Sequence, residues 1–455
     1  MADDLIYSRT QIDFVESILD TVRQHDGQLL DDLLNVTRMY QVEDLDFNSQ
    51  DEPNFDQQLP NDHDLLWKLL SQHHWHVCRC LASNDIDRAF RHQSRKLTCF
   101  LNLLNIYSSR LTSSTADDEH ELGQYSNDDD PTWLLPVFNR HLHELRLLAL
   151  LGNDESNSDD TEIGDTTNSN STIQTLNSQL SQQTTNTIQR FPLANKFRKM
   201  GIFIIVNQML KTYYALHKFN LCTYAIQKAE RPLKLYMQEE TTHQDHRYSS
   251  YVLTYRYFFG KHLLLKHDYS SAIEHFDYVF TNCLHVNQSG SITNKKQALL
   301  YLVVLKMLHG STPKMSLLEK YELYELIDII EPIRIGSLKL FLVKLREYEQ
   351  FLFDTGLLFL IENFKLITIR NLFRIYVYQI EQQQQIDRIP LDTALFLVNF
   401  EEEYFTINEL IDILNNMIDK GMIKGYISYK HRTLVISRKD PFPKDFRFTS
   451  LLNSS

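Results

Sequence analysis

The pattern of hydrophobic and polar positions changes from helical to strand-like near the C-terminus. Apolar side chains recur at helical spacing after Thr406, which forms with Glu409 the T-x-x-E pattern of a capping box. Gly421 can adopt the left-handed backbone conformation with which many helices end, so we predict that the helix ends there. Residues 423–428 alternate apolar and polar side chains, and residues 433–437 are a β-branched partner strand. This order predicts a winged helix, in which a two-stranded hairpin, the wing, follows a helix. We predict that two earlier helices of this domain, over residues 369–382 and 391–400, are joined by a turn over residues 381–390.

Helical spacing dominates most of the remaining chain, so we predict a mostly α-helical protein. Between residues 152 and 189 the sequence is rich in Asn, Ser, Thr and Gln, and such a segment buries too little apolar surface to offset its ordering entropy. We predict six regions: an N-terminal helical region (1–112), an acidic flexible loop (113–130), a helix (131–151), a disordered linker (152–189), TPR-like helical repeats (190–365) and a winged helix (366–443).

One helical pair has the residue spacing of a tetratricopeptide repeat. Gly260 and Ala272 occupy positions that these repeats fill with small residues, where two antiparallel helices touch, and Phe276 occupies a position that fills the groove between them. Because only one repeat matches this spacing well, we predict an irregular helical solenoid rather than a regular array. Such solenoids typically serve as binding scaffolds.

The amino-acid composition agrees with a helical protein of a reducing compartment. The chain has 455 residues with 12 Gly and 11 Pro, which agrees with a helical protein containing few tight turns. It has no run of eighteen apolar residues and its N-terminus is acidic, so we expect neither membrane insertion nor secretion. Five cysteines, an odd and small number, indicate a reducing compartment.

Charge is distributed unevenly along the chain. Residues 1–190 carry 32 acidic and 13 basic residues, a net charge of 13 − 32 = −19, whereas residues 191–455 carry the remaining 27 acidic and 33 basic residues, or +6. The predicted wing accounts for part of this positive charge. Its candidate nucleic-acid-binding residues, which we call the basic wing, are Lys424, Lys430, Arg432, Arg438 and Lys439.

Aromatic residues are interleaved with the basic wing. Tyr426, Tyr429 and His431 could stack on single-stranded bases, while the cations contact phosphates with little sequence preference. Arg370 and Arg374, four residues apart on the first helix of the domain, would extend this surface. An exposed hairpin whose charges are simply solvated is the alternative interpretation.

The sequence contains few residue patterns that would indicate an enzyme. The run SQHHWHVCRC contains His74 and Cys78 among other potential metal ligands, but it lacks paired C-x-x-C halves. The His141-Leu-His143 pair lacks the serine that zinc isopeptidases need eight positions later, where Leu151 stands. No phosphate-binding glycine loop and no nucleophile elbow is present. We therefore predict a protein without catalytic residues, metal or cofactor. We expect several aromatic residues to lie in the core: Phe351, Phe353, Phe359, Tyr376 and Phe396.

Helical repeats that run into a winged helix are the plan of PCI domains. The segments GIFIIVNQMLKTYYALHKFNLC (201–222), YRYFFGKHLLLKHDYSSAIEHFDYVF (255–280), FKLITIRNLFRIY (364–376) and KGYISYKHRTLVISRKDPFP (424–443) resemble the branch that holds the PCI subunit of the transcription-and-export complex 2 (TREX-2) and the signalosome subunit 12-like proteins. The resemblance places a PCI domain at about residues 250–440.

The resemblance implies a non-catalytic subunit. In this branch the helical repeats hold a large scaffold protein of the Sac/GANP type and a small acidic protein of the Sem/DSS type. The combined surface binds RNA or DNA and couples transcription to mRNA export at the nuclear pore, so a nuclear location with a cytoplasmic pool is expected. The alternative is a scaffold subunit of a signalosome-associated complex that does not bind nucleic acid.

Overall fold

The computed structural model describes residues 11–36, 59–60, 62–114, 131–158, 167–192, 195–239, 249–283, 289–381, 387–400 and 405–443. The chain divides into two compact units, Met1–Phe258 and Phe259–Ser455. Each unit is described separately. Most of the predicted acidic loop, residues 115–130, lies outside the described residues.

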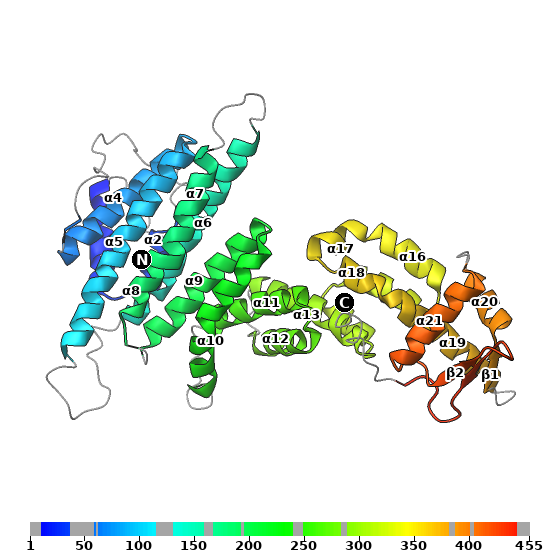
Figure 1. The fold of residues 1–455 in the computed structure, drawn as a ribbon. Coiled ribbons are helices and arrows are strands. Elements are labelled where there is room, and N and C mark those ends of the chain that lie inside the picture. The colour runs from blue at the N-terminus through cyan, green and yellow to red at the C-terminus, as the bar shows by residue number, and fades with distance from the viewer. Residues whose placement is uncertain are drawn as a thin grey trace. The chain divides into compact units, whose positions relative to one another are not determined.

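The first unit is an array of long helices packed side by side (Figure 1). Its helices are α1 (Gln11–Arg23), α2 (Gly27–Leu33), α4 (His63–Ala82), α5 (Ile86–Ser114), α6 (Leu135–Ser158), α7 (Thr167–Ser178), α8 (Thr185–Gln189), α9 (Lys196–Ala215), α10 (Cys222–Glu239) and most of α11 (Ser249–Leu265). Short 3-10 turns at Pro131–Leu134 and Phe219–Leu221 precede α6 and α10.

Helix α6 is central to this unit because it packs against α2, α5, α7 and α9. The aromatic core around it includes Phe100, which stacks on Phe138 at a centroid distance of 6.0 Å, and Phe197, which lies at a similar distance from Phe138. Asp62 begins α4 by accepting a hydrogen bond from the backbone N–H of Leu65, so a capping side chain sets the start of the helix.

The prediction of a disordered linker over residues 152–189 is wrong for most of that segment. Helix α6 extends to Ser158, and a continuous helical stretch runs from α7 through a π-helical turn (Gln179–Thr184) into α8. The few apolar residues of this stretch, Ile173, Leu176, Leu180 and Ile188, are buried. Because they fall at helical spacing on one face, and because α6 and α9 supply the rest of the core, a largely polar sequence is sufficient.

The second unit continues the helical repeats into the C-terminal domain (Figure 1). Its helices are α12 (Tyr269–Asn282), α13 (Ser289–Leu308), α14 (Met315–Lys320), α15 (Tyr324–Ile335), α16 (Leu338–Glu347), α17 (Glu349–Thr355), α18 (Leu358–Glu362), α19 (Phe364–Glu381), α20 (Leu391–Asn399) and α21 (Ile407–Asp419). Its strands are β1 (Arg388–Pro390), β2 (Gly425–Ser428) and β3 (Thr433–Ile436).

The predicted tetratricopeptide-like contact between α11 and α12 is confirmed. A Cβ atom on Gly260 would lie 2.9 Å from Cζ of Phe276, so a larger side chain would force the two helices apart. Ala272 and Phe276 are fully buried, and Tyr301 of α13 stacks on the Phe276 ring at 5.0 Å. Small residues therefore set the close approach of the helices, and an aromatic ring fills the groove beside them.

The C-terminal domain is the predicted winged helix with one additional strand. The capping box is present, since Thr406 and Glu409 each accept a backbone hydrogen bond from the other residue, and Gly421 has a φ of 69°. We predicted a turn over residues 381–390, but residues 388–390 pair with β3, so the antiparallel sheet has the order β1-β3-β2. A three-residue strand that contains a proline carries too little alternation to be read from sequence.

Candidate nucleic-acid interface

The wing consists of β2, β3 and the turn that joins them. Ile389 and Leu434 lie opposite each other in the register and are fully buried on the inner face of the sheet. On the outer face, Arg388, Val435 and Tyr426 form one row across the three strands. Since alternate residues of a strand face opposite sides, the same alternation that buries the isoleucine and leucine directs the arginine and tyrosine to solvent.

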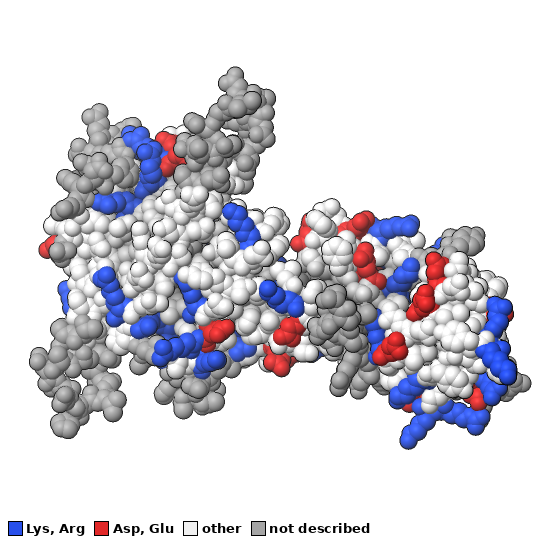
Figure 2. All heavy atoms as spheres, viewed as in Figure 1, with Lys and Arg blue, Asp and Glu red and all other residues white. Residues whose placement is uncertain are grey.

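All five residues of the basic wing are exposed. Figure 2 shows Lys and Arg side chains gathered around the hairpin of this domain. Three of them face aspartates: Lys424 Nζ lies 3.0 Å from Asp440, Arg432 Nη2 lies 3.1 Å from Asp392, and Arg438 Nη2 lies 2.8 Å from Asp387. Pairs this exposed contribute about 0–1 kcal/mol each, so a phosphate can compete for these cations.

Lys430 and Lys439 differ from the other three cations. Within the described residues neither ammonium group makes an ion pair. Lys430 is at the turn beside Tyr429, whose side chain is 64% exposed, and Tyr426 on β2 is 62% exposed. Asn415 of α21 donates a hydrogen bond to the Tyr429 hydroxyl at 3.3 Å, which fixes the ring at the edge of the wing. The tip therefore presents a cation and a positioned aromatic ring to solvent.

Arg370 is not part of this surface, and its prediction as a nucleic-acid-binding residue is wrong. Its side chain is buried on α19 and its guanidinium group donates to the backbone oxygens of Met422, Phe442 and Pro443. Burial, followed by repulsion from Arg374, lowers the pKa of Arg370 to about 10, so the group stays charged at neutral pH. Arg370 fastens the C-terminal segment to the domain. The half-buried Arg374 remains a prediction.

Arg388 is a site residue that the sequence analysis missed. Its side chain is 72% exposed, and its nearest carboxylate oxygen, on Asp387, lies 4.0 Å away. Assigning residues 381–390 to a turn hid its position on the outer face of the sheet. Arg388 and Pro390 are exposed on either side of the buried Ile389, but three residues are too short a pattern to predict a strand from sequence. Lys444 and Arg447, two cations that follow the basic wing in the sequence, lie outside the described residues.

Several aromatic side chains of the second unit lie at the surface, contrary to the prediction that they belong to the core. Phe353 of α17 is 66% exposed, Phe359 of α18 is 76% exposed, and Phe396 of α20 is 64% exposed. The Phe396 ring contacts that of the equally accessible Phe400, at a centroid distance of 5.8 Å. The prediction failed because hydrophobicity alone does not distinguish a core position from an unpartnered surface. Exposed aromatic residues are candidate contacts for a partner protein.

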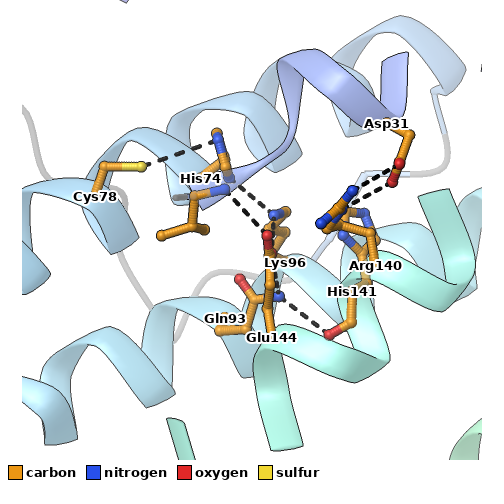
Figure 3. Close-up of polar contacts among 9 residues, drawn as sticks. Asp31, His74, Cys78, Gln93, Lys96, Arg140, His141 and Glu144 are labelled. Atoms are coloured by element: carbon orange, nitrogen blue, oxygen red, sulfur yellow. Dashed lines mark hydrogen bonds and ion pairs between the residues drawn. The ribbon is translucent and has the colours of Figure 1, made fainter. Parts of the chain in front are cut away.

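The potential metal ligands of the first unit belong to a buried polar network instead (Figure 3). Lys96 Nζ lies 2.9 Å from His74 Nδ1 and 3.2 Å from Glu144 Oε2, and all three residues are buried. Glu144 also accepts hydrogen bonds from Gln93 and from the backbone N–H of Val36. Among the described residues, no group of three His, Cys, Asp or Glu side chains is arranged to hold a metal ion.

This network has the chemistry of a structural clamp. Burial lowers the pKa of His74, and its Nδ1 faces the Lys96 ammonium, so the ring is a neutral acceptor. Burial raises the pKa of the Cys78 thiol to about 12, which keeps it in the unreactive thiol form. Arg140 pairs beside the network with Asp31 through two hydrogen bonds of 3.0 and 2.8 Å. Together these contacts connect residues 31–36 to α4, α5 and α6.

Comparison with known proteins identifies the family. A model of the PCI domain matches residues 345–438, a range that includes the winged helix and the helices immediately before it. The chain is 32% identical over 320 residues to the PCI domain-containing protein 2 homolog of Dictyostelium discoideum, and the match covers 69% of this chain and 68% of that protein. The chain belongs to the PCI domain-containing protein 2 family.

Animal members of the family match a shorter segment. PCI domain-containing protein 2 of Danio rerio is 34% identical over 249 residues, and its homolog in Drosophila melanogaster is 31% identical over 246 residues. Each match covers 54% of this chain and 58% of the relative, so the chain spans less than two thirds of their length. Within the described residues, no helix has the length and apolarity to cross a membrane.

Proposed function

We propose that this PCI protein is the PCI subunit of a TREX-2-like assembly, which couples transcription to nuclear mRNA export near the nuclear pore. In this proposal one surface holds a scaffold protein of the Sac/GANP type together with a small acidic protein of the Sem/DSS type. A second surface, the basic wing, contacts RNA or DNA. Neither surface performs a catalytic step.

The exposed wing tip is the observation that carries the nucleic-acid part of the proposal. Lys430 and Lys439 have no carboxylate partner among the described residues, and the exposed ring of Tyr429 stands beside Lys430 at the turn. Backbone phosphates and unstacked bases fit such a surface without sequence-specific contacts. Binding should therefore weaken steeply as salt is raised.

Charge reversal at the wing tests this contact. Replacing Lys430, Arg432, Arg438 and Lys439 with Glu should abolish binding of single-stranded RNA and DNA in mobility-shift titrations, because it converts four attractive contacts into repulsive ones. The matched control reverses four exposed cations elsewhere in the same unit, Lys266, Lys314, Lys320 and Arg334. Equal loss of binding in the two quadruple variants would reduce the effect to net charge and refute a specific wing contact.

The exposed aromatic residues support the scaffold part of the proposal. Phe353 and Phe359, on consecutive short helices, are exposed here and would become the buried aromatic anchors of an interface with the scaffold protein. Replacing both with Ser should remove the scaffold protein from affinity-purified material while leaving RNA binding intact. The wing variant should show the reverse pattern, and coupled losses would contradict two separate surfaces.

The ion pairs of the wing favour a second candidate function, a signalosome-associated scaffold without nucleic-acid binding. Asp387, Asp392 and Asp440 already face three of the five wing cations, which lowers the local positive charge. Mass spectrometry of proteins purified with the full chain distinguishes the two candidates. Export-scaffold and pore proteins would support the first function, and signalosome subunits would support the second.

A further inference from the structure

A second group of cations lies in the first unit, on α6 and α9. Arg146 of α6 is half-buried and its guanidinium group is held on two sides: Nε donates to Gln208 Oε1 at 3.0 Å, and Nη2 lies 3.2 Å from His143 Nδ1. Gln208 is itself buried, and its amide nitrogen donates to Asn139 Oδ1 at 3.1 Å. The orientation of Arg146 is therefore fixed, and Nη1 makes none of these contacts.

Lys211 adds a second positive charge from α9, three residues after Gln208 and therefore on the face of that helix that contacts Arg146. The side chain is half-buried, and within the described residues its ammonium group makes no hydrogen bond or ion pair. Burial first and repulsion from Arg146 second lower the pKa of Lys211. Two cations that repel each other in a partly desolvated place, without a counterion, raise the free energy of the folded chain.

His143 provides a neutral hydrogen-bond donor beside these cations. Burial, followed by the charges of Arg146 and Lys211, lowers the pKa of His143 to about 4, so the ring is uncharged at neutral pH. Its Nδ1 accepts from Arg146, which places the ring proton on Nε2.

Among the residues that the structure describes, no carboxylate pairs with this group. Glu144 is the one acidic residue between Arg140 and Arg146 in sequence, and it is turned into the buried network around Lys96. Asp31 is engaged by Arg140. Helix α9 contains no acidic residue, and residues 195–239 as a whole contain eight Lys or Arg against two Glu. The positive charge is therefore open to an external anion.

We propose that Arg146, Lys211 and His143 form a binding site for a phosphate monoester group, which we call the α6–α9 anion site. Two cations match the charge of about −1.5 to −2 that such a group carries at neutral pH. The oriented guanidinium, the ammonium and the imidazole N–H match its three acceptor oxygens. Because the site is half-buried and consists of three side chains, a compact terminal phosphate fits better than a continuous nucleic-acid backbone. The group is either inorganic phosphate or a phosphorylated side chain of another protein.

Thermal unfolding of the full chain tests the site directly. All three tryptophans, Trp67, Trp75 and Trp133, lie in the first unit, so their fluorescence reports on that unit alone. Sodium phosphate should raise the midpoint above that in sodium chloride of equal ionic strength, because a ligand that binds the folded state stabilises it. Equal midpoints in the two salts would overturn the proposal.

Substitution at Lys211 provides the matched comparison. Lys211→Met removes one charge but keeps the aliphatic stem, so the phosphate affinity should fall at least tenfold, while the midpoint in chloride stays equal or rises because the repulsion is relieved. Lys218→Met removes an exposed charge seven positions later and should respond to phosphate as the unmodified chain does. Equal phosphate responses in the two variants would refute the site. If Lys211→Met does not fold, Lys211→Arg and Lys211→Gln replace it: the site requires a response in the first and none in the second.

Competition identifies the source of the phosphate. A phosphoserine peptide that displaces inorganic phosphate, when its unphosphorylated form does not, assigns the site to a modified partner protein. Binding of inorganic phosphate without peptide competition assigns it to the free ion. Displacement by an RNA oligonucleotide lacking terminal phosphates at lower concentration than either would overturn the assignment in favour of a general polyanion surface.

Discussion

Lys96 in the first unit and Lys430 at the wing tip carry the same side chain in opposite surroundings. Lys96 is fully buried between His74 and Glu144, and each donor–acceptor contact is set by packing of α4, α5 and α6. Lys430 is exposed and makes no ion pair within the described residues. Desolvation makes an unpaired buried charge very costly, whereas an exposed charge remains hydrated. Lys96 therefore has a structural role because it is buried and paired, whereas Lys430 is available to a ligand because it is exposed.

The largest loss of stability is expected when one partner of the buried Lys96–Glu144 pair is removed. Lys96→Met leaves the Glu144 carboxylate buried without its cation, so the free energy of unfolding should fall by about 3–5 kcal/mol. Urea unfolding followed by tryptophan fluorescence measures this loss in the first unit. Lys68→Met, at an exposed position of the neighbouring helix α4, should change stability by less than about 0.5 kcal/mol.

A double variant separates the clamp from the hydrophobic core. Adding Glu144→Leu to Lys96→Met should recover part of the loss, since it removes the stranded carboxylate. If Lys96→Met and Lys68→Met were equally stable, the buried network would not contribute to the stability of the first unit. Lys96 and Lys430 would then not differ in the way we infer.

Arg370 and Arg374 repeat the comparison within one helix. Arg370→Met removes hydrogen bonds from a charged donor to buried carbonyl oxygens, and should destabilise the winged helix by about 1.5–3 kcal/mol. Hydrogen exchange measured on peptides that cover residues 417–443 should show faster exchange. Arg374→Met, at a half-buried position, should leave exchange nearly unchanged. Faster exchange in Arg374→Met than in Arg370→Met would reverse our assignment of the two residues.

The smallest stability effect is expected at the exposed ion pair of Asp387 and Arg438. The hydrogen bond from Arg438 lowers the pKa of Asp387 below its usual value. Any stabilisation from this pair is therefore present above the ordinary aspartate pKa and is lost as the pH falls through the lowered pKa. Asp387→Asn should lower stability only slightly at neutral pH, and this difference should vanish in acid.

Asp387→Asn also tests whether the aspartate competes with nucleic acid for Arg438. Freeing Arg438 should strengthen binding of a single-stranded oligonucleotide and steepen its salt dependence by up to about 0.7 in the slope of log K against log salt. Titrations at several salt concentrations measure this slope. Weaker binding by Asp387→Asn would show that Asp387 positions Arg438 for the ligand rather than competing with it.

The regular elements could be predicted where one strong local signal specified them. The capping box at Thr406 and Glu409, the helix end at Gly421 and the Gly260–Phe276 contact each depend on residues close in sequence or on a fixed repeat spacing. The helices over residues 167–189 could not be read in the same way. Their few apolar residues become sufficient only when α6 and α9 cover them, and that partner surface is not visible in a local window.

The candidate site was predictable only in part for the same reason. Five wing cations were predicted correctly to be exposed, because charged side chains in a turn or next to short strands remain hydrated. Sequence alone could not reveal that Asp387 and Asp392, far away along the chain, would face Arg438 and Arg432. It also could not distinguish the buried Arg370 from its neighbour on the same helix.

By itself, the sequence of this PCI protein determined its helical class, its winged-helix ending and the sign of the charge on the wing, because periodicity, capping and composition act over a few residues. The tertiary structure decided which cations are clamped, which are paired and which are open to a ligand. That decision depends on burial and on carboxylates from distant segments, as the contrast among Lys96, Lys211 and Lys430 shows. Solvation is a property of the assembled surface, so it emerges only once the helices and strands have packed.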